Sequence, residues 1–218
     1  MHLRFLHISG VLLSLLLLLG ACASPGCREP WRSALKQYSR DDAVREVLLV
    51  RYDGGSDATV FFYQKQDGRW KLLRKGPAYV GKNGLGKTAE GDAKTPEGDF
   101  GVLTAFGILP DPGTALPWLP VTESTFACDE EGPWYNRIID TAATHHACKG
   151  EDMFHTAPAY HYGMALDFNP ACRYPDGSAI FFHCKGHKAW TGGCVAVDEA
   201  FMQEILTRSH PGLRVIIH

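Results

Sequence analysis

One histidine and one cysteine stand close together near the C-terminus, in a setting that suits nucleophilic catalysis. A short apolar run, Ala179 to Phe182, predicts a buried strand that ends at His183. A polar loop then leads to Gly192, Gly193 and Cys194, and a second apolar run follows. Such a loop can bring the imidazole and the thiol side by side. The imidazole would then take the thiol proton, and the thiolate would attack an acyl carbon.

The backbone around the cysteine suits the same chemistry. Glycines allow unusual backbone angles and a close approach of substrate. We expect the backbone N–H groups of Gly193 and Cys194 to form an oxyanion hole. His183 would act first as general base and later as acid to the leaving amine. The acyl-enzyme would pass to an amine or to water, and neither a metal nor an organic cofactor is expected.

Three motifs in order resemble those of L,D-transpeptidase catalytic domains of the YkuD type, which are bacterial cysteine enzymes that act on peptidoglycan stem peptides. The first is a histidine at a strand end, followed after a loop by Ser/Thr-x-Gly-Cys, and it matches His183 and residues 191–194. The second, residues 90–100 (EGDAKTPEGDF), is similar to the family's GD-x-KTPEG-x-F segment. The third is residues 160–169, which match the strand that precedes the active-site hairpin.

The resemblance covers roughly residue 47 to the C-terminus, and it implies a mainly β fold, a sandwich or barrel with a few short helices. It also implies a cysteine-dependent enzyme that forms an acyl-enzyme with a stem peptide for cross-linking or exchange. The backbone carbonyl of Cys184 would orient the imidazole. Gly192 and Ala196 depart from the better-known members, which carry His and then Arg or Asn there. A divergent branch is therefore indicated, and a hydrolase on the same fold (L,D-carboxypeptidase, endopeptidase or amidase) stays open.

Several residues around the expected cleft are candidates for binding the stem peptide. They are Thr191 and Gly192 beside the cysteine, and Tyr160, His161 and Tyr162 on the expected strand. The last two could equally be edge-strand residues without contact to substrate. A non-catalytic lipoprotein that binds wall peptides is the competing hypothesis. Its signature would be the loss of the histidine or the cysteine of the pair, and both are present.

The N-terminus carries a targeting signal. Residues 1–21 combine Arg4 with an apolar run, and residues 19–22 (LGAC) fit a bacterial lipobox whose cleavage would leave Cys22 lipidated. An ordinary secretory signal, cut near Ala21 or Ala23, is the alternative, and the run is too short for a transmembrane anchor. Residues 22–46 are then a tether with a short helix, and residues 47–218 form the catalytic domain. We expect an exported protein anchored on the periplasmic side of the outer membrane, since Ala23 rather than Asp follows the cysteine.

Seven cysteines bear on the redox state. With Cys22 lipidated and Cys194 reduced for catalysis, five cysteines remain. Because five is an odd number, one must stay outside the disulfides within the chain, and Cys27 on the tether is expected to be that one. The other four could form two disulfides in three pairings: Cys128, Cys148, Cys172 and Cys184. The pairing of Cys128 with Cys148 is favoured because both lie in one irregular region. A rival hypothesis makes Cys194 structural, paired with Cys184.

Other function classes receive little support. A net charge of −2 supplies no basic field for nucleic acid. Residues 81–88 nearly match a phosphate-binding loop, but no helix can follow them before Pro96. His145, His146 and Cys148 lack a second pair at zinc spacing, so no metal is expected. The expected partners are peptidoglycan stem peptides and a membrane, with the protein itself a monomer.

The elements that would position the site follow from the apolar pattern. With 218 residues, 45% of them apolar, the chain is long enough for one domain with a core. Helices are predicted over residues 31–40 and, behind an Asp198 cap, over residues 199–207. Asp167 is expected to be a hydrogen-bonding turn residue. Strands are predicted over residues 47–51, 59–64, 70–73, 160–169 and 213–217.

Overall fold

The structure is a computed structural model that describes residues 30–218, with side chains from residue 33 onward. The expected signal peptide, Cys22, Cys27 and most of the tether lie outside the described residues. Three helices are present in the described part, α1 (Pro30–Gln37), α2 (Thr141–Thr144) and α3 (Glu199–Arg208). The strands are β1 (Glu46–Gly54), β2 (Asp57–Gln66), β3 (Arg69–Tyr79), β4 (Gly98–Gly107), β5 (Trp118–Pro120), β6 (Thr125–Cys128), β7 (Ile138–Asp140), β8 (Gly150–Asp152), β9 (Gly163–Leu166), β10 (Phe181–Cys184), β11 (Val195–Val197) and β12 (Arg214–Ile217).

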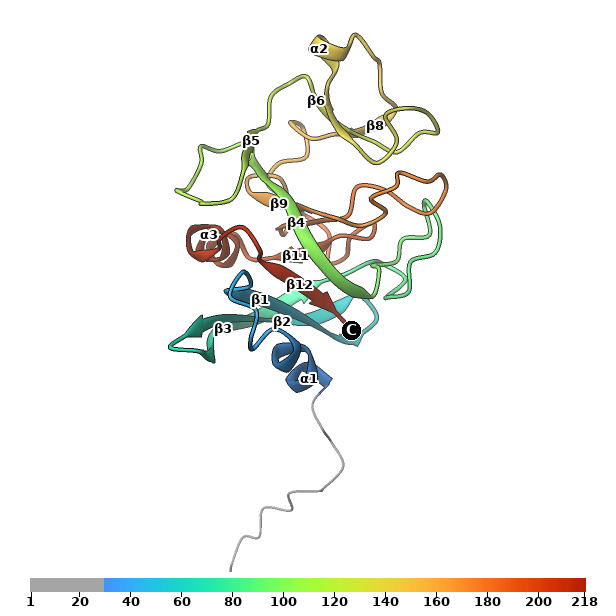
Figure 1. Cartoon of the computed structure of the whole chain (residues 1–218). Coiled ribbons are helices and arrows are strands. Elements are labelled where there is room, and N and C mark those ends of the chain that lie inside the picture. Colours follow the sequence, from blue (N-terminus) through green and yellow to red (C-terminus); the bar gives the residue numbers. More distant parts are fainter. Residues whose placement is uncertain (1–29) are drawn as a thin grey trace, which may run out of the picture.

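The main sheet closes on itself as a barrel (Figure 1). Its strand order is β12-β1-β2-β3-β11-β10-β9-β4-β5, and β12 also pairs with β4. The parallel pairing of β12 with β1 and its antiparallel pairing with β4 join the two ends of the sheet. Closure removes the unpaired edges that an open sheet would expose. The mainly β fold with a few short helices is therefore confirmed.

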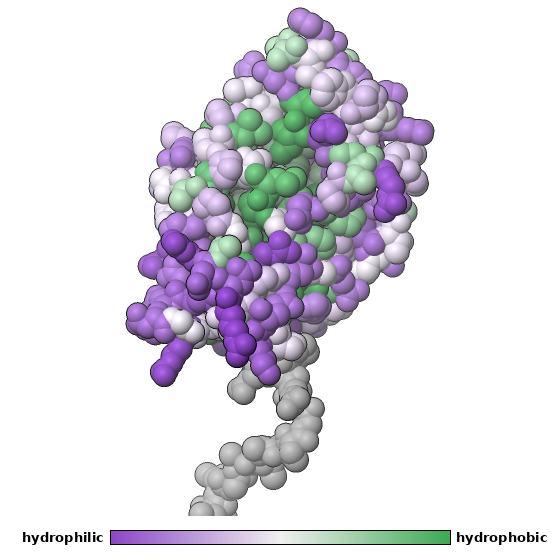
Figure 2. Space-filling view, in the orientation of Figure 1, coloured by the Kyte–Doolittle hydropathy of each residue, from purple (hydrophilic) through white to green (hydrophobic). Residues whose placement is uncertain are grey.

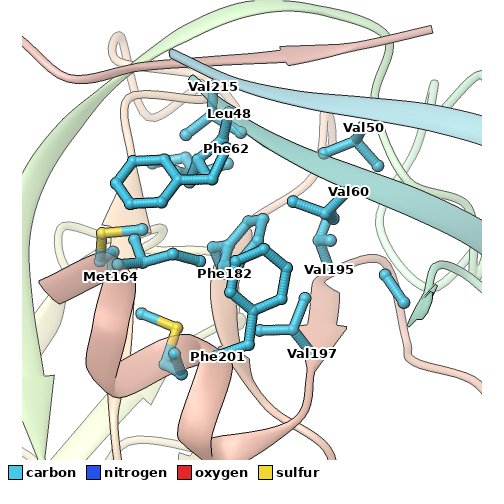
Figure 3. Packing of buried hydrophobic residues seen from close by; sticks show 14 of the residues in the cluster. Leu48, Val50, Val60, Phe62, Met164, Phe182, Val195, Val197, Phe201 and Val215 are labelled. Carbon is cyan, nitrogen blue, oxygen red and sulfur yellow. The ribbon is translucent and has the colours of Figure 1, made fainter. Parts of the chain in front are cut away.

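Alternating side chains fill the inside of the barrel (Figure 3). Leu48 and Val50 of β1 belong to the same buried cluster as Phe182 of β10, and Phe201 of α3 also packs in this cluster. The neighbouring residues of β1, Val47 and Leu49, pack on the outside. These outward residues lie under α1 in a second cluster, so β1 is buried on both faces. Burial on both faces accounts for its unbroken apolar run.

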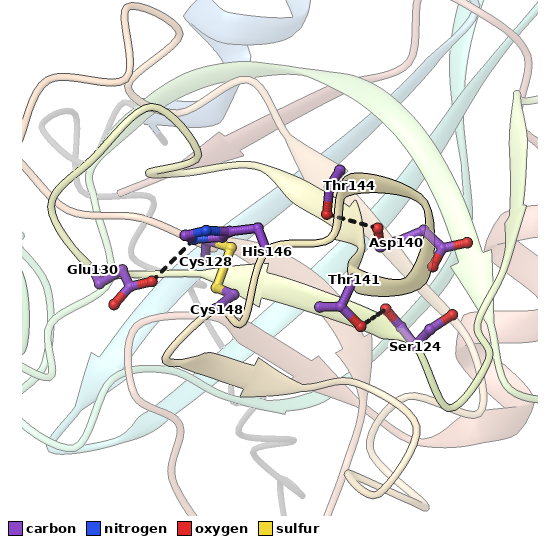
Figure 4. The surroundings of a disulfide bond; sticks show 8 residues. All are labelled: Ser124, Cys128, Glu130, Asp140, Thr141, Thr144, His146 and Cys148. Atoms are coloured by element: carbon purple, nitrogen blue, oxygen red, sulfur yellow. Dashed lines mark hydrogen bonds and ion pairs between the residues drawn. A yellow bond between two sulfur atoms is a disulfide. The ribbon is translucent and has the colours of Figure 1, made fainter.

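A small three-stranded sheet, β7-β6-β8, forms a layer above the barrel (Figure 1). The disulfide between Cys128 and Cys148 ties the end of β6 to the loop before β8 (Figure 4). His146 beside it contacts Glu130, with Nε2 and Oε1 3.1 Å apart. The favoured disulfide pairing is therefore confirmed. Cys172 and Cys184 are free thiols, so the second expected disulfide is absent from the described chain.

Two expectations about single elements are wrong. The strand expected over residues 160–169 begins only at Gly163, because the backbone before it turns, with Tyr160 N–H bonded to the Thr156 carbonyl. Asp198 does precede α3, but its carboxylate makes no capping bond and instead pairs with Lys185 at 3.0 Å. Asp167 does hydrogen-bond, accepting from the Gly101 N–H at 2.8 Å.

Within residues 30–218, no helix is both long and apolar enough to cross a membrane. On the face drawn in Figure 2, polar and charged side chains gather at the lower left, around the end of the β2–β3 hairpin, and apolar residues show in a hollow near the centre.

Candidate active site

His183 lies on β10, and Cys194 directly precedes the neighbouring strand β11, so that the two residues share one face of the barrel wall. Strands β10 and β11 run parallel, with His183 opposite Ala196 and Phe182 opposite Val195. Phe182 and Val195 point into the barrel core. Because successive side chains of an extended chain point to opposite faces, the neighbouring His183 and Cys194 point outward. That outward face is covered by the small sheet and the turn before β9. The pair therefore sits between two layers, with exposed fractions of 7% and 8%.

The tautomer of the histidine follows from its partner. Nδ1 of His183 lies 2.7 Å from the carbonyl oxygen of Cys184, which can only accept, so Nδ1 carries the proton and Nε2 a lone pair. The Tyr160 ring meets the imidazole edge to face, with centroids 5.3 Å apart. Burial lowers the pKa of His183 to about 4. The imidazole is therefore neutral at pH 7, and Nε2 is available as a base.

The thiol of Cys194 is held by the chain beside it. Its sulfur accepts from the Phe181 N–H and donates to the Ala179 carbonyl, both at 3.3 Å. Burial, with a smaller contribution from the charge of Glu151, raises the pKa of Cys194 to about 12, although the Phe181 bond and the charge of Lys87 oppose the rise. In the described chain no hydrogen bond joins the thiol to His183. The resting pair is thus a neutral thiol beside a neutral imidazole, and apo sites often tighten only when substrate binds.

The backbone of the nucleophile is fixed by two threonine hydroxyls. Thr191 Oγ1 donates to the Cys194 carbonyl at 2.6 Å, and Thr95 Oγ1 donates to the same oxygen at 3.2 Å. Thr95 is fully buried and also accepts from the Gly81 N–H at 2.8 Å. The segment similar to the family's GD-x-KTPEG motif therefore packs directly beneath the cysteine, which explains why two distant stretches of sequence serve one site.

Gly193 is required by its surroundings, whereas Gly192 is not. Gly193 has φ +151°, and a Cβ there would lie 2.9 Å from the Lys94 carbonyl oxygen. A Cβ on Gly192 would meet nothing within 4 Å. The N–H of Gly193 donates to Thr191 Oγ1 at 3.2 Å, so in this state it is not directed at an oxyanion. The expected oxyanion hole at Gly193 and Cys194 therefore stays a prediction that needs the Gly193 N–H to exchange its partner.

A cavity of about 400 Å³ opens above the pair. Its walls include both catalytic candidates, Thr191, Gly192, Gly193 and the ring of Tyr160. Its lining also includes ionisable side chains, from several parts of the chain: Lys87, Glu90, Asp129, Glu151, His187 and Lys188. The cavity can thus hold an extended polar substrate against the thiol, with charges of both signs within reach.

Two expected substrate contacts lie elsewhere. His161 pairs with Glu199 at the start of α3, with Nδ1 and Oε2 2.7 Å apart. Tyr162 is buried in the barrel core with its ring against Trp118. Neither residue lines the cavity. Tyr160 does line it, but it is 1% exposed, so it forms a wall behind the imidazole.

Cys184 contributes through its backbone alone. Its thiol is buried and donates to the Tyr162 carbonyl at 3.4 Å, and burial raises its pKa to about 12. The rival pairing of Cys184 with Cys194 is absent, since both are free. Within residues 30–218, no group of three or more His, Cys, Asp or Glu side chains is arranged to hold a metal ion.

The sequence alone did not single out Lys87 and Glu151. Lys87 is 2% exposed, and Glu151 on β8 accepts from the Tyr160 hydroxyl. Burial raises the pKa of Glu151, and the charge of Asp129 adds to that rise. Both residues come from segments far from the cysteine in the chain, so only their spatial proximity marks them. The position of Lys87 at the end of the Gly-rich stretch, residues 81–87, is the one sequence signal that could have drawn attention to it.

No curated protein sequence matches the chain. Bd1075 of Bdellovibrio bacteriovorus is a similar solved structure, with 13% identity, a TM-score of 0.43, and coverage of 80% of this chain and 48% of that one. The helical cell shape determining protein Pgp2 of Campylobacter jejuni is another, with 14% identity, a TM-score of 0.42, and coverage of 80% and 47%. The chain spans about half the length of these two proteins.

The chain also matches the model of a protein family. The model of the YkuD L,D-transpeptidase catalytic domain matches residues 53–217. These residues include every barrel strand except most of β1, and they also include the small sheet and the His183–Cys194 pair. Because this match covers well over half of the chain, the protein belongs to the YkuD family of L,D-transpeptidase catalytic domains.

Proposed function

We propose that this protein is a cysteine acyltransferase that acts on peptidoglycan stem peptides and transfers the acyl group to an amine. Family membership supports a peptidoglycan-related function of the L,D-transpeptidase type. The observation that carries the finer proposal is the placement of His183 and Cys194 on one face of adjacent strands at the floor of a cavity. The bond from Nδ1 to the Cys184 carbonyl adds to it, because this bond leaves Nε2 as the base.

The neutral resting pair favours attack coupled to proton transfer. As the sulfur of Cys194 bonds to the carbonyl carbon, its proton passes to Nε2 of His183 and the C=O electron pair moves to oxygen. Collapse of this intermediate breaks the C–N bond, and the leaving amine takes the proton from His183. The product of this half-reaction is a thioester on Cys194. A free thiolate is not needed at rest, which fits a thiol whose pKa burial raises to about 12.

The second half-reaction regenerates the free enzyme from the thioester. An acceptor that arrives as an ammonium group first loses one proton to solvent. The neutral amine then attacks the thioester carbon and gives a second proton to His183, and the sulfur leaves and recovers that second proton. Glu90, Asp129 and Glu151 line the cavity and favour an acceptor that arrives as an ammonium group. This charge is the reason for preferring an amine over water as the acceptor.

The test uses the full chain, its Cys194→Ala variant and a Cys172→Ala control, since Cys172 is a free thiol that does not line the cavity. Each is incubated with purified peptidoglycan and with tetrapeptide muropeptides, and the products are identified by mass spectrometry. New cross-links or amino-acid exchange in the full chain and the control, but not in Cys194→Ala, would support the proposal. Shortened peptides without new amide bonds would replace it with a hydrolase, and product formation by Cys194→Ala would exclude the cysteine mechanism.

We propose in addition that the protein is exported and anchored through a lipid on Cys22, on the periplasmic side of the outer membrane. The disulfide between Cys128 and Cys148 supports an oxidising compartment. Mass spectrometry of the N-terminal peptide from the native cell envelope tests the anchor. A diacylglyceryl mass on Cys22 is expected, and an unmodified N-terminus near residue 22 or 24 would contradict it.

A further inference from the structure

A lysine side chain is buried in the wall of the cavity beside the nucleophile. Lys87 is 2% exposed, and its stem passes so close to Gly177 that a Cβ there would lie 2.4 Å from Lys87 Cε. At its far end, Nζ would lie 3.7 Å from a Cβ on Gly193, the residue before Cys194. The absence of a side chain at Gly177 leaves room for the lysine stem, and Nζ lies within van der Waals range of the Gly193 position. Lys87 thus occupies a defined channel, unlike a surface lysine.

The ammonium group has one proton left for a ligand. Nζ donates to the Ala89 carbonyl at 3.2 Å and to Asp92 Oδ1 at 3.0 Å. An ammonium has three donors, and no third acceptor is present among the residues that the structure describes. Asp92 is itself well satisfied, since it also accepts the N–H groups of Thr88, Ala89 and Lys94. Despite partial burial, these bonds and the Lys87 contact lower the pKa of Asp92 to about 2.

The site lacks other positive charge where negative charge must develop. His183 is neutral at rest, and the N–H of Gly193 is directed at Thr191. Lys188 also lines the cavity, but it is exposed and its Nζ lies over the Trp190 ring at 4.5 Å. Exposed charges are screened by water and salt, whereas buried ones are screened much less. Lys87 is therefore the cation best placed to act on the sulfur.

We propose that Lys87 stabilises the negative charge that develops on the Cys194 sulfur and on the attacked carbonyl oxygen. This inference rests on the proposed function, in which Cys194 is the nucleophile. It adds a charged group to the His–Cys pair and gives the Gly- and Lys-rich stretch before the GD-x-KTPEG segment a direct role. No new covalent step is involved, because Lys87 acts through its charge and its free N–H.

The test must also allow for the other ionisable groups around Cys194. They face it from several parts of the chain: Lys87 and Glu90, Asp129 after β6, Glu151 on β8, Tyr160 before β9, His183 on β10, and the loop residues His187 and Lys188. The charge of Glu151 opposes that of Lys87, since it raises the pKa of the thiol. A change at Lys87 alone must therefore be compared with the same change at another cavity lysine.

The experiment measures alkylation of Cys194 by iodoacetamide against pH, with each cysteine followed by peptide mass spectrometry. Lys87→Met should shift the pH profile of Cys194 alkylation so that the rate at a fixed pH between about 7 and 9 falls about tenfold. Lys87→Arg, which keeps the charge, should recover most of the rate. Lys188→Met removes a lysine from the same cavity and should stay within about twofold of wild type. In the peptidoglycan assay, Lys87→Met should lower kcat and leave KM nearly unchanged.

The outcomes separate this inference from the proposed function. An unchanged pH profile in folded Lys87→Met would overturn the inference, and so would a rise in KM alone, which would assign Lys87 to ground-state binding. Asp92→Asn serves if Lys87→Met does not fold: removing the counter-charge should move the alkylation midpoint down, and an upward shift or none would count against the inference. If Cys194→Ala keeps full activity, the proposed function itself fails.

Discussion

Thr95→Val tests whether the GD-x-KTPEG segment supports the nucleophile. The substitution keeps the shape of a fully buried side chain but removes its hydroxyl. The buried Gly81 N–H then loses its acceptor at 2.8 Å, which costs about 1–3 kcal/mol. The bond to the Cys194 carbonyl adds about 0.5–1 kcal/mol at most, because Thr191 still donates to that oxygen. We expect the free energy of unfolding to fall by about 2–3 kcal/mol.

Urea unfolding and peptidoglycan turnover measure the two consequences. Because the hydroxyl also fixes the backbone of Cys194, kcat should fall by about tenfold or more at temperatures where the variant is folded. Thr207→Val is the matched control, since the Thr207 hydroxyl is exposed and bonds only within α3. It should change stability by less than about 0.5 kcal/mol. A Thr95→Val protein as stable and as active as this control would refute the reasoning.

Three further predictions concern charge, pH and the disulfide. Glu151→Gln removes a negative charge that raises the pKa of Cys194, so the pH midpoint of Cys194 alkylation should move down; no shift would contradict the assigned coupling. Because the folded pKa of His183 is about 4 and its ordinary value 6.5, the unfolded state binds a proton first as pH falls. Stability should therefore drop between pH 6.5 and 4, by up to about 3 kcal/mol, and less steeply in a His183→Gln protein, as urea unfolding at several pH values would show. Cys148→Ala opens the link to Cys128, 20 residues away, and should cost about 3 kcal/mol in urea unfolding without reductant; equal midpoints would contradict this.

The local elements of the site could be predicted because their signals are local. The apolar runs that flank His183 and Cys194 each place alternate residues in the barrel core. The apolar pattern of the sequence therefore agrees with the residues that the fold buries. The helix after Asp198 begins where the sequence indicates, although its expected cap bonds Lys185 instead. When a side chain such as that of Asp198 has two possible partners, the sequence does not indicate which of them it will bind.

The long-range part of the site could not be predicted. Tyr160 looked like a strand residue because aromatic side chains favour strands, yet tertiary packing places it in a turn against the imidazole. Its partner Glu151 belongs to a separate small sheet, and Lys87 reaches the cavity past Gly177, where a side chain would collide with the lysine stem. These contacts depend on how the barrel closes and how the second layer is laid over it, which single-sequence patterns do not contain.

Burial of the nucleophile has two opposite consequences. A thiol whose pKa is raised to about 12 is almost wholly protonated at neutral pH, and oxidants react mainly with the thiolate. The same burial that weakens Cys194 as a resting nucleophile therefore protects it in a compartment where Cys128 and Cys148 are oxidised. Reactivity must then come from the substrate complex, in which the substrate presents its carbonyl carbon while Nε2 of His183 accepts the proton. On this view the buried charge of Lys87 matters most in the transition state, where it offsets the negative charge that the resting site avoids.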